Sequence, residues 1–283
     1  MPRLNHDKAL GAMLGLAVGD AVGAPGDARP GQGTGVTQLA VSLGTSIAEL
    51  GGYDADHALR GYVSWYRTDP PGMSDDMRAV LGTIAGGDDS YRATSSFHLG
   101  GGVTSGNGAL MRATPIGVAY AGRDAALRDN TLADAALTHF DPLAGKVALL
   151  HNQALAWLLI GGPALLFDQL KNPESLDDRI EDVVIPATSG VRGFAESLAA
   201  SDPGSALASL AMALVAAFNA DSFEQGLTWA VGLGGDTAAD GAVTGALLGA
   251  RLGASAIPGH WVEGLERRAE VEALTARLIA VAA

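Results

Sequence analysis

The sequence predicts an all-α protein, and three observations lead to that prediction. Apolar residues recur at spacings of three and four along most of the chain. Alternating runs of Val, Ile, Thr and aromatic residues, which are typical of strands, are scarce. Ala and Gly are abundant, which lets helices approach one another closely. Because no linker divides the 283 residues, we expect a single domain over residues 1–283.

The predicted helices follow one another from the N-terminus to the C-terminus. Asp54 stands at the start of the helix expected over 54–67, and Asp221 or Ser222 at the start of the one expected over 222–231. Short polar side chains at such positions cap helices. The stretch 206–218 is interrupted by Ser209 and is too short to cross a bilayer, so it predicts a buried helix. The helices are expected over residues 8–18, 38–50, 54–67, 77–84, 131–140, 142–160, 206–219, 222–231 and 241–252.

Two stretches break the helical pattern. Residues 88–104 are the least helical part of the chain, and the run of three glycines at 100–102 predicts a mobile loop there. Residues 172–189 are predicted to be irregular and acidic.

The composition excludes several classes of protein. The absence of cysteine excludes disulfides, thiolate metal sites and cysteine nucleophiles, and it suits a reducing compartment. Polar residues precede the first apolar run, so no signal segment is recognised and we expect a cytoplasmic protein that does not enter a membrane. A net charge of −13 argues against general nucleic-acid binding, which depends on clustered Lys and Arg.

Four motifs in order resemble those of the ADP-ribosylglycohydrolase family. They are GAMLGLAVGDAVGAP at 11–25, GNGALMRATP at 106–115 followed by THFDP at 138–142, GGDTAAD at 234–240 within a match running over 204–249, and Ile257-Pro258 with Trp261. The resemblance implies a compact orthogonal helical bundle. It also implies hydrolysis at the anomeric carbon of a ribose, with two Mg²⁺ or Mn²⁺ ions held by oxygen ligands.

The metal motifs of that family are altered in this chain. The family's Thr-Asp-Asp-Thr falls on Thr34-Gly35-Val36-Thr37, and its Asp-Thr-Asp-Thr keeps Asp236 but has Ala238 and Ala239 for the second pair. A further family Asp falls on Ala208, and a family Glu is matched by Asp27. With so few carboxylates left, two adjacent divalent ions would repel each other without compensation, so we predict no metal site and no cofactor.

The remaining motif residues predict a pocket for ADP-ribose or a related ribosyl nucleotide. Asp27 and Asp236 are the candidate catalytic acids, and the candidate ligand-binding residues are Ser105, Gly106, Asn107, Gly108, His139 and Gly235. Glycines in the 105–108 loop expose backbone amides to a ligand, and Asn107 is expected to be an exposed loop residue. Arg112 is expected either to reach a phosphate or to pair with an acid.

Other acids have structural interpretations. Asp20 is expected to hydrogen-bond a first helical turn, and Asp240 lies early in a helix, where the dipole favours a carboxylate. Ser74-Asp75-Asp76 superficially resembles a displaced acidic metal motif, but we interpret it as a capped helix start.

Three functions stay open at this point. The chain binds a ribosylated ligand without metal hydrolysis, or hydrolyses one without metals through Asp27 and Asp236 as acid and base, or is an interaction protein that retains only the fold. A polar cleft would favour the first two.

Overall fold

The computed structural model describes residues 4–26, 28–70, 73–162, 178–189 and 191–282 of the chain. Within these ranges the protein contains helices and no strand, which confirms the all-α prediction; a single bridge joins Gly106 and Ser205. The helices are α1 (His6–Gly23), α2 (Gly35–Leu50), α3 (Ala55–Tyr66), α4 (Asp75–Ala85), α5 (Ser90–Leu99), η1 (Leu110–Arg112), α6 (Thr114–Ala119), α7 (Asp124–Ala136), α8 (Pro142–Ile160), α10 (Asp178–Thr188), α11 (Arg192–Ser201), α12 (Ala206–Asn219), α13 (Phe223–Gly232), α14 (Thr237–Leu252), η2 (Ala254–Ala256), α15 (Gly259–Glu263) and α16 (Arg268–Ala282).

Side-chain caps start several of these helices where the sequence predicted them. The Asp54 carboxylate accepts a hydrogen bond from the His57 amide at the start of α3, and the Ser222 hydroxyl accepts one from the Gln225 amide at the start of α13. Each cap satisfies an amide that has no partner inside its helix. These two predicted starts are confirmed.

Several segments differ from the sequence prediction, and α6, α11, α15 and α16 lie where no helix was expected. The expected loop at 88–104 contains α5, which Asp89 caps through the Arg92 amide. The part of 172–189 that is described contains α10, because Ile180, Val183, Val184 and Ala187 form one buried stripe; residues 172–177 lie outside the described residues. The helix expected at 131–140 begins earlier, at Asp124, and ends at Ala136.

The closest helix packing joins α1 to α14, and it uses glycine on both sides. Gly15 faces Gly245, and a methyl group added to either one would lie 2.1 Å from the carbonyl oxygen of the other. Gly11 faces Gly249 and Gly19 faces Gly241 in the same way, so the glycines recur every fourth residue in two antiparallel helices. The two backbones are therefore in direct contact, and no side chain separates them.

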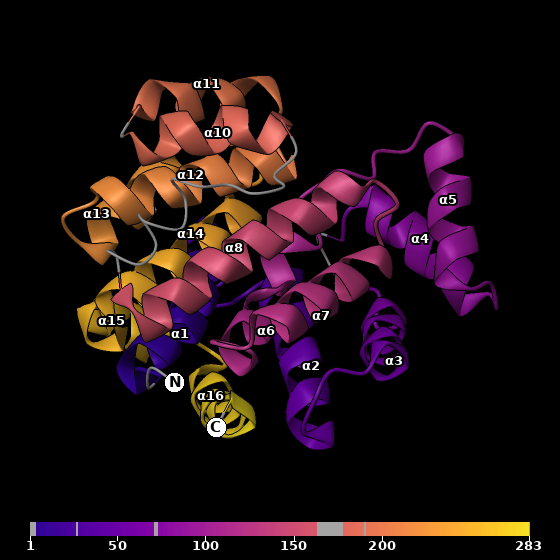
Figure 1. Ribbon diagram of the computed structural model, residues 1–283, viewed down its shortest axis with the longest axis horizontal. Helices are drawn as coiled ribbons and strands as arrows, with labels where there is room; N and C mark the ends of the chain where they lie inside the picture. The colour runs from indigo at the N-terminus through magenta and orange to yellow at the C-terminus, as the bar shows by residue number, and fades with distance from the viewer. Residues whose placement is uncertain (1–3, 27, 71–72, 163–177, 190, 283) are drawn as a thin grey trace.

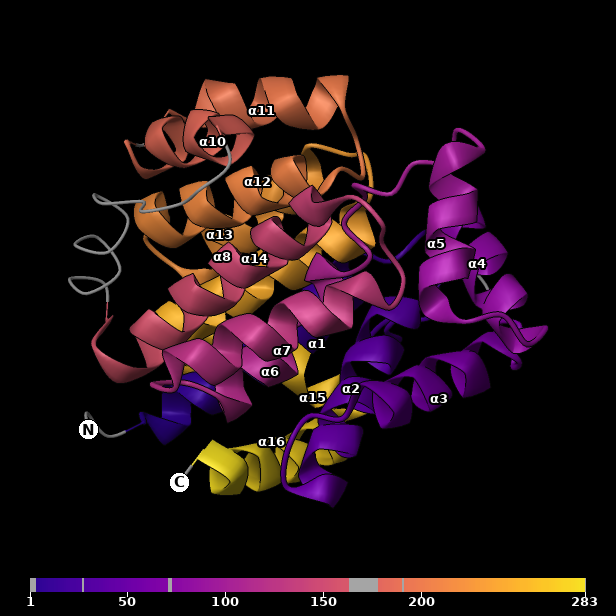
Figure 2. The same cartoon turned by 45° about the vertical axis from the view of Figure 1, so that its right-hand side comes forward.

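This contact brings the end of α1 to the beginning of α14. The Thr237 hydroxyl donates a hydrogen bond of 2.5 Å to the Gly23 carbonyl oxygen. Figure 1 shows α1 and α14 deep in the bundle behind α8, with α10 and α11 above α12. In both views α4 and α5 stand at one side of the main body, which Figure 2 shows from a second angle.

One helix of the described part of the chain, α8, is long and apolar enough to cross a membrane, with a mean hydropathy of 1.3. However, 72% of that window is buried inside the protein. A core helix has the same length and composition, and the burial of Ala144, Val147 and Leu155 agrees with that interpretation.

Candidate functional site

A cavity of about 840 Å³ collects the motif residues from distant parts of the chain. It lies where the starts of α2, α4, α12 and α14 meet the loop before η1. Its polar lining consists of Gln32, Thr34, Ser74, Asp76, Ser105, Asn107, His139, Asp202, Ser205 and Asp236, and its glycines include Gly106 and Gly108. A space of this size is sufficient for a nucleoside or nucleotide.

The structure brings most of the predicted site residues to this cavity. Ser105, Gly106, Asn107, Gly108, His139 and Asp236 all line it. Gly235 does not line it, but its φ of +81° turns the chain immediately before Asp236. Asp27 lies outside the described residues, although Pro25 and Ala28 on either side of it line the cavity.

Backbone hydrogen bonds fix the 105–108 loop against the start of α12. The Asn107 amide donates to the Gly204 carbonyl at 3.0 Å, and the Ala206 amide donates to the Ser105 carbonyl at 3.2 Å. The side chain of Asn107 is only 6% exposed. The expectation that Asn107 is an exposed loop residue is therefore wrong, because the loop packs on α12 and turns this side chain inward.

Asn107 belongs to a buried chain of hydrogen bonds that ends at Asp236. Its Nδ2 donates to Asp236 Oδ2 at 3.1 Å and to Ser209 Oγ at 3.1 Å. Ser209 in turn donates to Asp240 Oδ1 at 2.5 Å. We call Asp240, Ser209, Asn107 and Asp236 the amide relay. Because both amide protons of Asn107 are used inside the protein, its orientation is fixed by residues behind the cavity wall.

Asp240 is almost fully buried, with 2% of its surface exposed. Burial raises the pKa of Asp240 to about 7, the Ser209 hydrogen bond opposes that rise, and the nearby charge of Asp236 adds to it. Asp240 therefore accepts a buried hydrogen bond from Ser209, in addition to its favourable position near the start of a helix. The sequence did not predict Ser209 as a site residue. A single hydroxyl within the apolar stretch 206–218 was the one feature that could have indicated it.

Asp20 organises the start of α2 from the end of α1. Its carboxylate accepts hydrogen bonds from the Thr34 amide at 2.8 Å, the Thr34 hydroxyl at 2.7 Å, the Thr37 amide at 3.0 Å and the Thr37 hydroxyl at 2.5 Å. Burial raises the pKa of Asp20, and these hydrogen bonds oppose the rise. The helical turn to which Asp20 hydrogen-bonds is therefore the first turn of α2, the helix that follows its own.

Arg112 supports the other side of the 105–108 loop. It is fully buried, it donates to Asp134 Oδ2 at 3.0 Å, and it donates to the Gly108 carbonyl at 3.1 Å. Asp134 also accepts a hydrogen bond of 2.6 Å from the Tyr62 hydroxyl. Of the two expected roles of Arg112, the structure shows the pairing with an acid.

His139 forms part of the cavity wall beside Gly108. Its ring lies 2.8 Å from the Thr138 hydroxyl through Nδ1, and a methyl group added to Gly108 would lie 3.2 Å from Nε2. Burial lowers the pKa of His139 to about 3, and the positive charge of Arg112 adds to the effect. His139 is therefore neutral at physiological pH.

Comparison with known proteins decides the family. A family model described as ADP-ribosylglycohydrolase matches residues 1–283. The chain belongs to the ADP-ribosylglycohydrolase family. A solved structure described as an ADP-ribosylglycohydrolase-related protein complex superimposes with a TM-score of 0.80 at 32% identity, over 98% of this chain and 99% of that one.

Two relatives extend the comparison to sequence. The ADP-ribosyl-[dinitrogen reductase] glycohydrolase of Rhodospirillum rubrum is 30% identical over 181 residues, which cover 56% of this chain and 59% of that protein. An uncharacterised protein of Archaeoglobus fulgidus is 28% identical over 308 aligned residues, which cover 96% of each chain.

The positions of the family's metal motifs supply few carboxylates in this ADP-ribosylglycohydrolase family member. Gly35 and Val36 line the cavity where the family motif has carboxylates, Ala238 lines it from α14, and Ala208 is buried. The carboxylate oxygens of Asp20 already accept hydrogen bonds from Thr34 and Thr37. Within the described ranges, no group of three or more His, Cys, Asp or Glu side chains has the arrangement of a metal site.

Asp76 adds a carboxylate that the sequence analysis left outside the site. Ser74 caps α4 by accepting from the Met77 amide at 3.3 Å, so the interpretation as a capped helix start holds. In addition, Ser74 and Asp76 both line the cavity. Burial raises the pKa of Asp76, and the neighbouring Asp75 adds to the rise.

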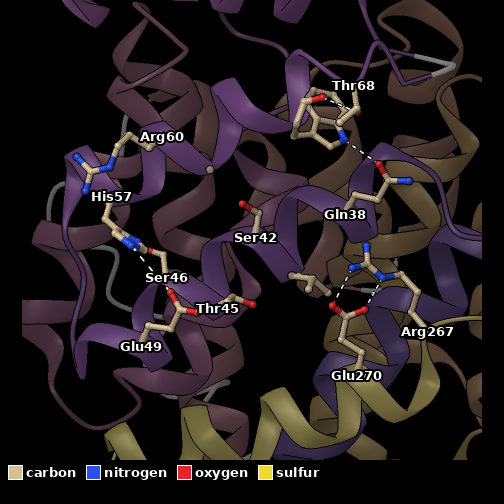
Figure 3. Close-up of a pocket in the computed structure, with 13 residues that line it drawn as sticks. Gln38, Ser42, Thr45, Ser46, Glu49, His57, Arg60, Thr68, Arg267 and Glu270 are labelled. Atoms are coloured by element: carbon tan, nitrogen blue, oxygen red, sulfur yellow. Dashed lines mark hydrogen bonds and ion pairs between the residues drawn. The ribbon is translucent and has the colours of Figure 1, made fainter.

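A second pocket of about 540 Å³ lies on the outer face of α2, between α3 and the region where α16 begins. Figure 3 shows two contacts between polar and charged groups of this pocket: Arg267 faces Glu270, and His57 lies between Ser46 and Glu49. None of the predicted site residues lines this pocket. The 840 Å³ cavity is therefore the candidate ligand site.

Proposed function

We propose that this family member binds a ribosylated ligand, an ADP-ribosyl group or a related ribosyl compound, in the 840 Å³ cavity and does so without a pair of metal ions. The amide relay is the observation that carries the proposal. It holds an amide and a carboxylate side by side on the cavity wall, at 3.1 Å.

The chemistry of ribose explains why this pair suits the ligand. Vicinal hydroxyls offer both donors and acceptors, and a carboxylate such as Asp236 accepts from them while an amide oxygen such as that of Asn107 also accepts. Because the relay orients both groups before the ligand arrives, binding does not have to order them. The polar lining from Thr34, Ser105 and Ser205 supports a polar ligand and disfavours a protein that retains the fold alone.

Metal-independent hydrolysis is the second candidate, and Asp76 favours it. A carboxyl group whose pKa is raised by burial can donate a proton to the leaving group of an N- or O-riboside. A carboxylate on the same cavity, Asp236, would accept a proton from water as the water oxygen bonds to the anomeric carbon and the glycosidic bond breaks. The products are free ribose, or a ribosyl moiety, and the protonated leaving group.

Calorimetry and product analysis test the two candidates together. The full-length protein in EDTA is titrated with ribose, adenosine, ADP and ADP-ribose, and the same mixtures are analysed by chromatography after incubation. Saturable binding of at least one ribose-bearing compound supports the proposed site. Slow release of ribose that is lost in Asp76→Asn or Asp236→Asn supports hydrolysis. A complete lack of binding at millimolar concentration overturns the proposal.

A further inference from the structure

The charged side chains among the described residues that line the cavity are all acidic. Asp76, Asp202 and Asp236 line it, and none of the described residues that line it is Arg or Lys. His139, the only histidine in that described lining, is neutral because of its burial. The field in the cavity is therefore negative, within a chain whose net charge is −13.

Three arginines directly follow cavity-lining residues in the chain, and each forms an ion pair outside the cavity. Arg29 is exposed and pairs with Glu266 at 3.3 Å. Arg112 is fully buried and donates to Asp134 and to the Gly108 carbonyl. Arg78 on α4 pairs with Asp69 at 2.7 Å. None of these three guanidinium groups lines the cavity.

Helix N-termini are the usual substitute for a cation in binding phosphate, but here side chains of the protein already accept from some of their amides. At α2, the amides of Thr34 and Thr37 donate to Asp20. At α4 the Met77 amide donates to Ser74, and at α12 the Ala208 amide donates to Ser205.

The fourth helix start, that of α14, carries a charge of its own. Asp236 occupies the N-cap position of α14, so a carboxylate already stands at this helix end. The Asp236 side chain makes no capping hydrogen bond to the amides of α14, but its negative charge would repel an incoming phosphate at this helix end.

We propose that the natural ligand of this cavity is a ribosyl compound without phosphate, and that its ribose is joined to a neutral or positively charged group. A cationic N-ribosyl nucleoside satisfies all of these observations, because the carboxylates compensate its charge and the amide relay binds its hydroxyls. ADP-ribose carries a pyrophosphate that no described group of the cavity neutralises. This inference rests on the proposed function, since it names the ligand class for the same site.

The test compares ligands that share a ribose and differ in charge. The full-length protein is titrated at low salt in EDTA with nicotinamide riboside, which is a cation, with adenosine, which is neutral, and with ADP-ribose. We expect nicotinamide riboside to bind at least about tenfold more tightly than ADP-ribose, with adenosine between them. Added salt should weaken the binding of the cation and strengthen that of the anion, because it screens the cavity charge.

Variants identify the source of the preference. Asp76→Asn and Asp202→Asn each remove one charge without touching the amide relay, and we expect each to reduce the ratio of riboside affinity to ADP-ribose affinity by about threefold or more. Asp124→Asn is the matched control, because Asp124 is exposed on α7 and does not line the cavity. The control should leave the ratio unchanged.

The outcomes separate this inference from the proposed function. Tighter binding of ADP-ribose than of both nucleosides in EDTA overturns the charge inference and leaves the ribosyl site in place. Equal affinities that no variant alters also overturn it. If none of the three compounds binds, the proposed function and the inference fall together.

Discussion

Asn107 and Asp236 lie 129 residues apart in the chain, and their side chains are joined by a hydrogen bond of 3.1 Å on the wall of the cavity. The contact depends on two other buried groups, Ser209 and Asp240, which fix the amide from behind. The site is therefore a small cooperative unit, and its members cannot be exchanged independently.

Asn107→Asp tests that unit. The change replaces a donor with an acceptor next to Asp236 and close to the buried Asp240, and both former contacts become unfavourable. We expect a loss of about 2–4 kcal/mol in the free energy of unfolding at pH 8, and a smaller loss at pH 5, where the added carboxyl can be protonated. Urea denaturation at both pH values measures this. Asn5→Asp is the control, because Asn5 caps α1 and aspartate caps equally well.

Asp240→Asn should change how stability depends on pH. The pKa of Asp240 is raised from 3.8 to about 7 in the folded protein, so the folded state holds a proton that the unfolded state has lost between these values. The stability that the wild type gains from holding this proton is fully present below pH 3.8 and is lost as the pH rises toward 7. We expect the variant to gain stability relative to the wild type over that range, by on the order of a few kcal/mol at most. Urea denaturation of both proteins at pH 4.5 and pH 7.5 measures this. The same difference in the free energy of unfolding between variant and wild type at both pH values would contradict the prediction.

Gly15→Ala tests the direct contact between α1 and α14. The added methyl group would lie 2.1 Å from the Gly245 carbonyl oxygen, which belongs to backbone that cannot rotate away. The helices must separate, and we expect a loss of about 3 kcal/mol or more, or no folded protein. Gly193→Ala is the control, since Gly193 also lies in a helix but has open space around it. That variant should gain up to about 1 kcal/mol, and a similar melting temperature for the two variants would be incompatible with the packing described.

Arg112→Met removes one partner of a fully buried ion pair. It leaves the Gly108 carbonyl without its side-chain donor and the buried Asp134 carboxylate with the Tyr62 hydroxyl but no cation, so we expect a loss of about 3–5 kcal/mol and a displaced 105–108 loop. Arg78→Met breaks an exposed pair with Asp69 and should leave the stability nearly unchanged. Thermal and urea unfolding of both variants provide the comparison.

Divalent cations should not stabilise this protein. With Gly35, Val36 and Ala238 at the positions where the family motif supplies ligands, we expect no saturable binding of two Mg²⁺ or Mn²⁺ ions and no shift in melting temperature at millimolar metal. Isothermal calorimetry would reveal a contrary result as a stoichiometry of two.

The helices themselves were largely predictable from the sequence, for identifiable reasons. A helix such as α8 is apolar along its whole length and buries most of its residues, so its hydrophobicity alone predicts it. In contrast, α5 buries only Ala93 and Thr94, which is too small a stripe to detect. The stripe of α10 was hidden by the acids around it and by Pro186 inside the helix.

The candidate site was predictable only in part. The motifs predicted that Asn107, His139 and Asp236 would meet, and the structure does bring them to one cavity. Their partners were not predictable, because Ser209 and Asp240 come from two helices whose relative rotation depends on the packing of the whole bundle. Sequence spacing contains no information about that rotation.

The glycine contact between α1 and α14 also has a consequence for synthesis of the chain. The Thr237 hydroxyl and the Gly23 carbonyl that it binds are separated by 214 positions. When α1 leaves the ribosome, the backbone surface that will cover Gly11, Gly15 and Gly19 has not yet been made. A nascent chain must therefore hold a small-residue apolar helix without its partner until almost all of its length is translated. Contacts of this range slow folding, and the first helix is where we expect a chaperone to bind during translation.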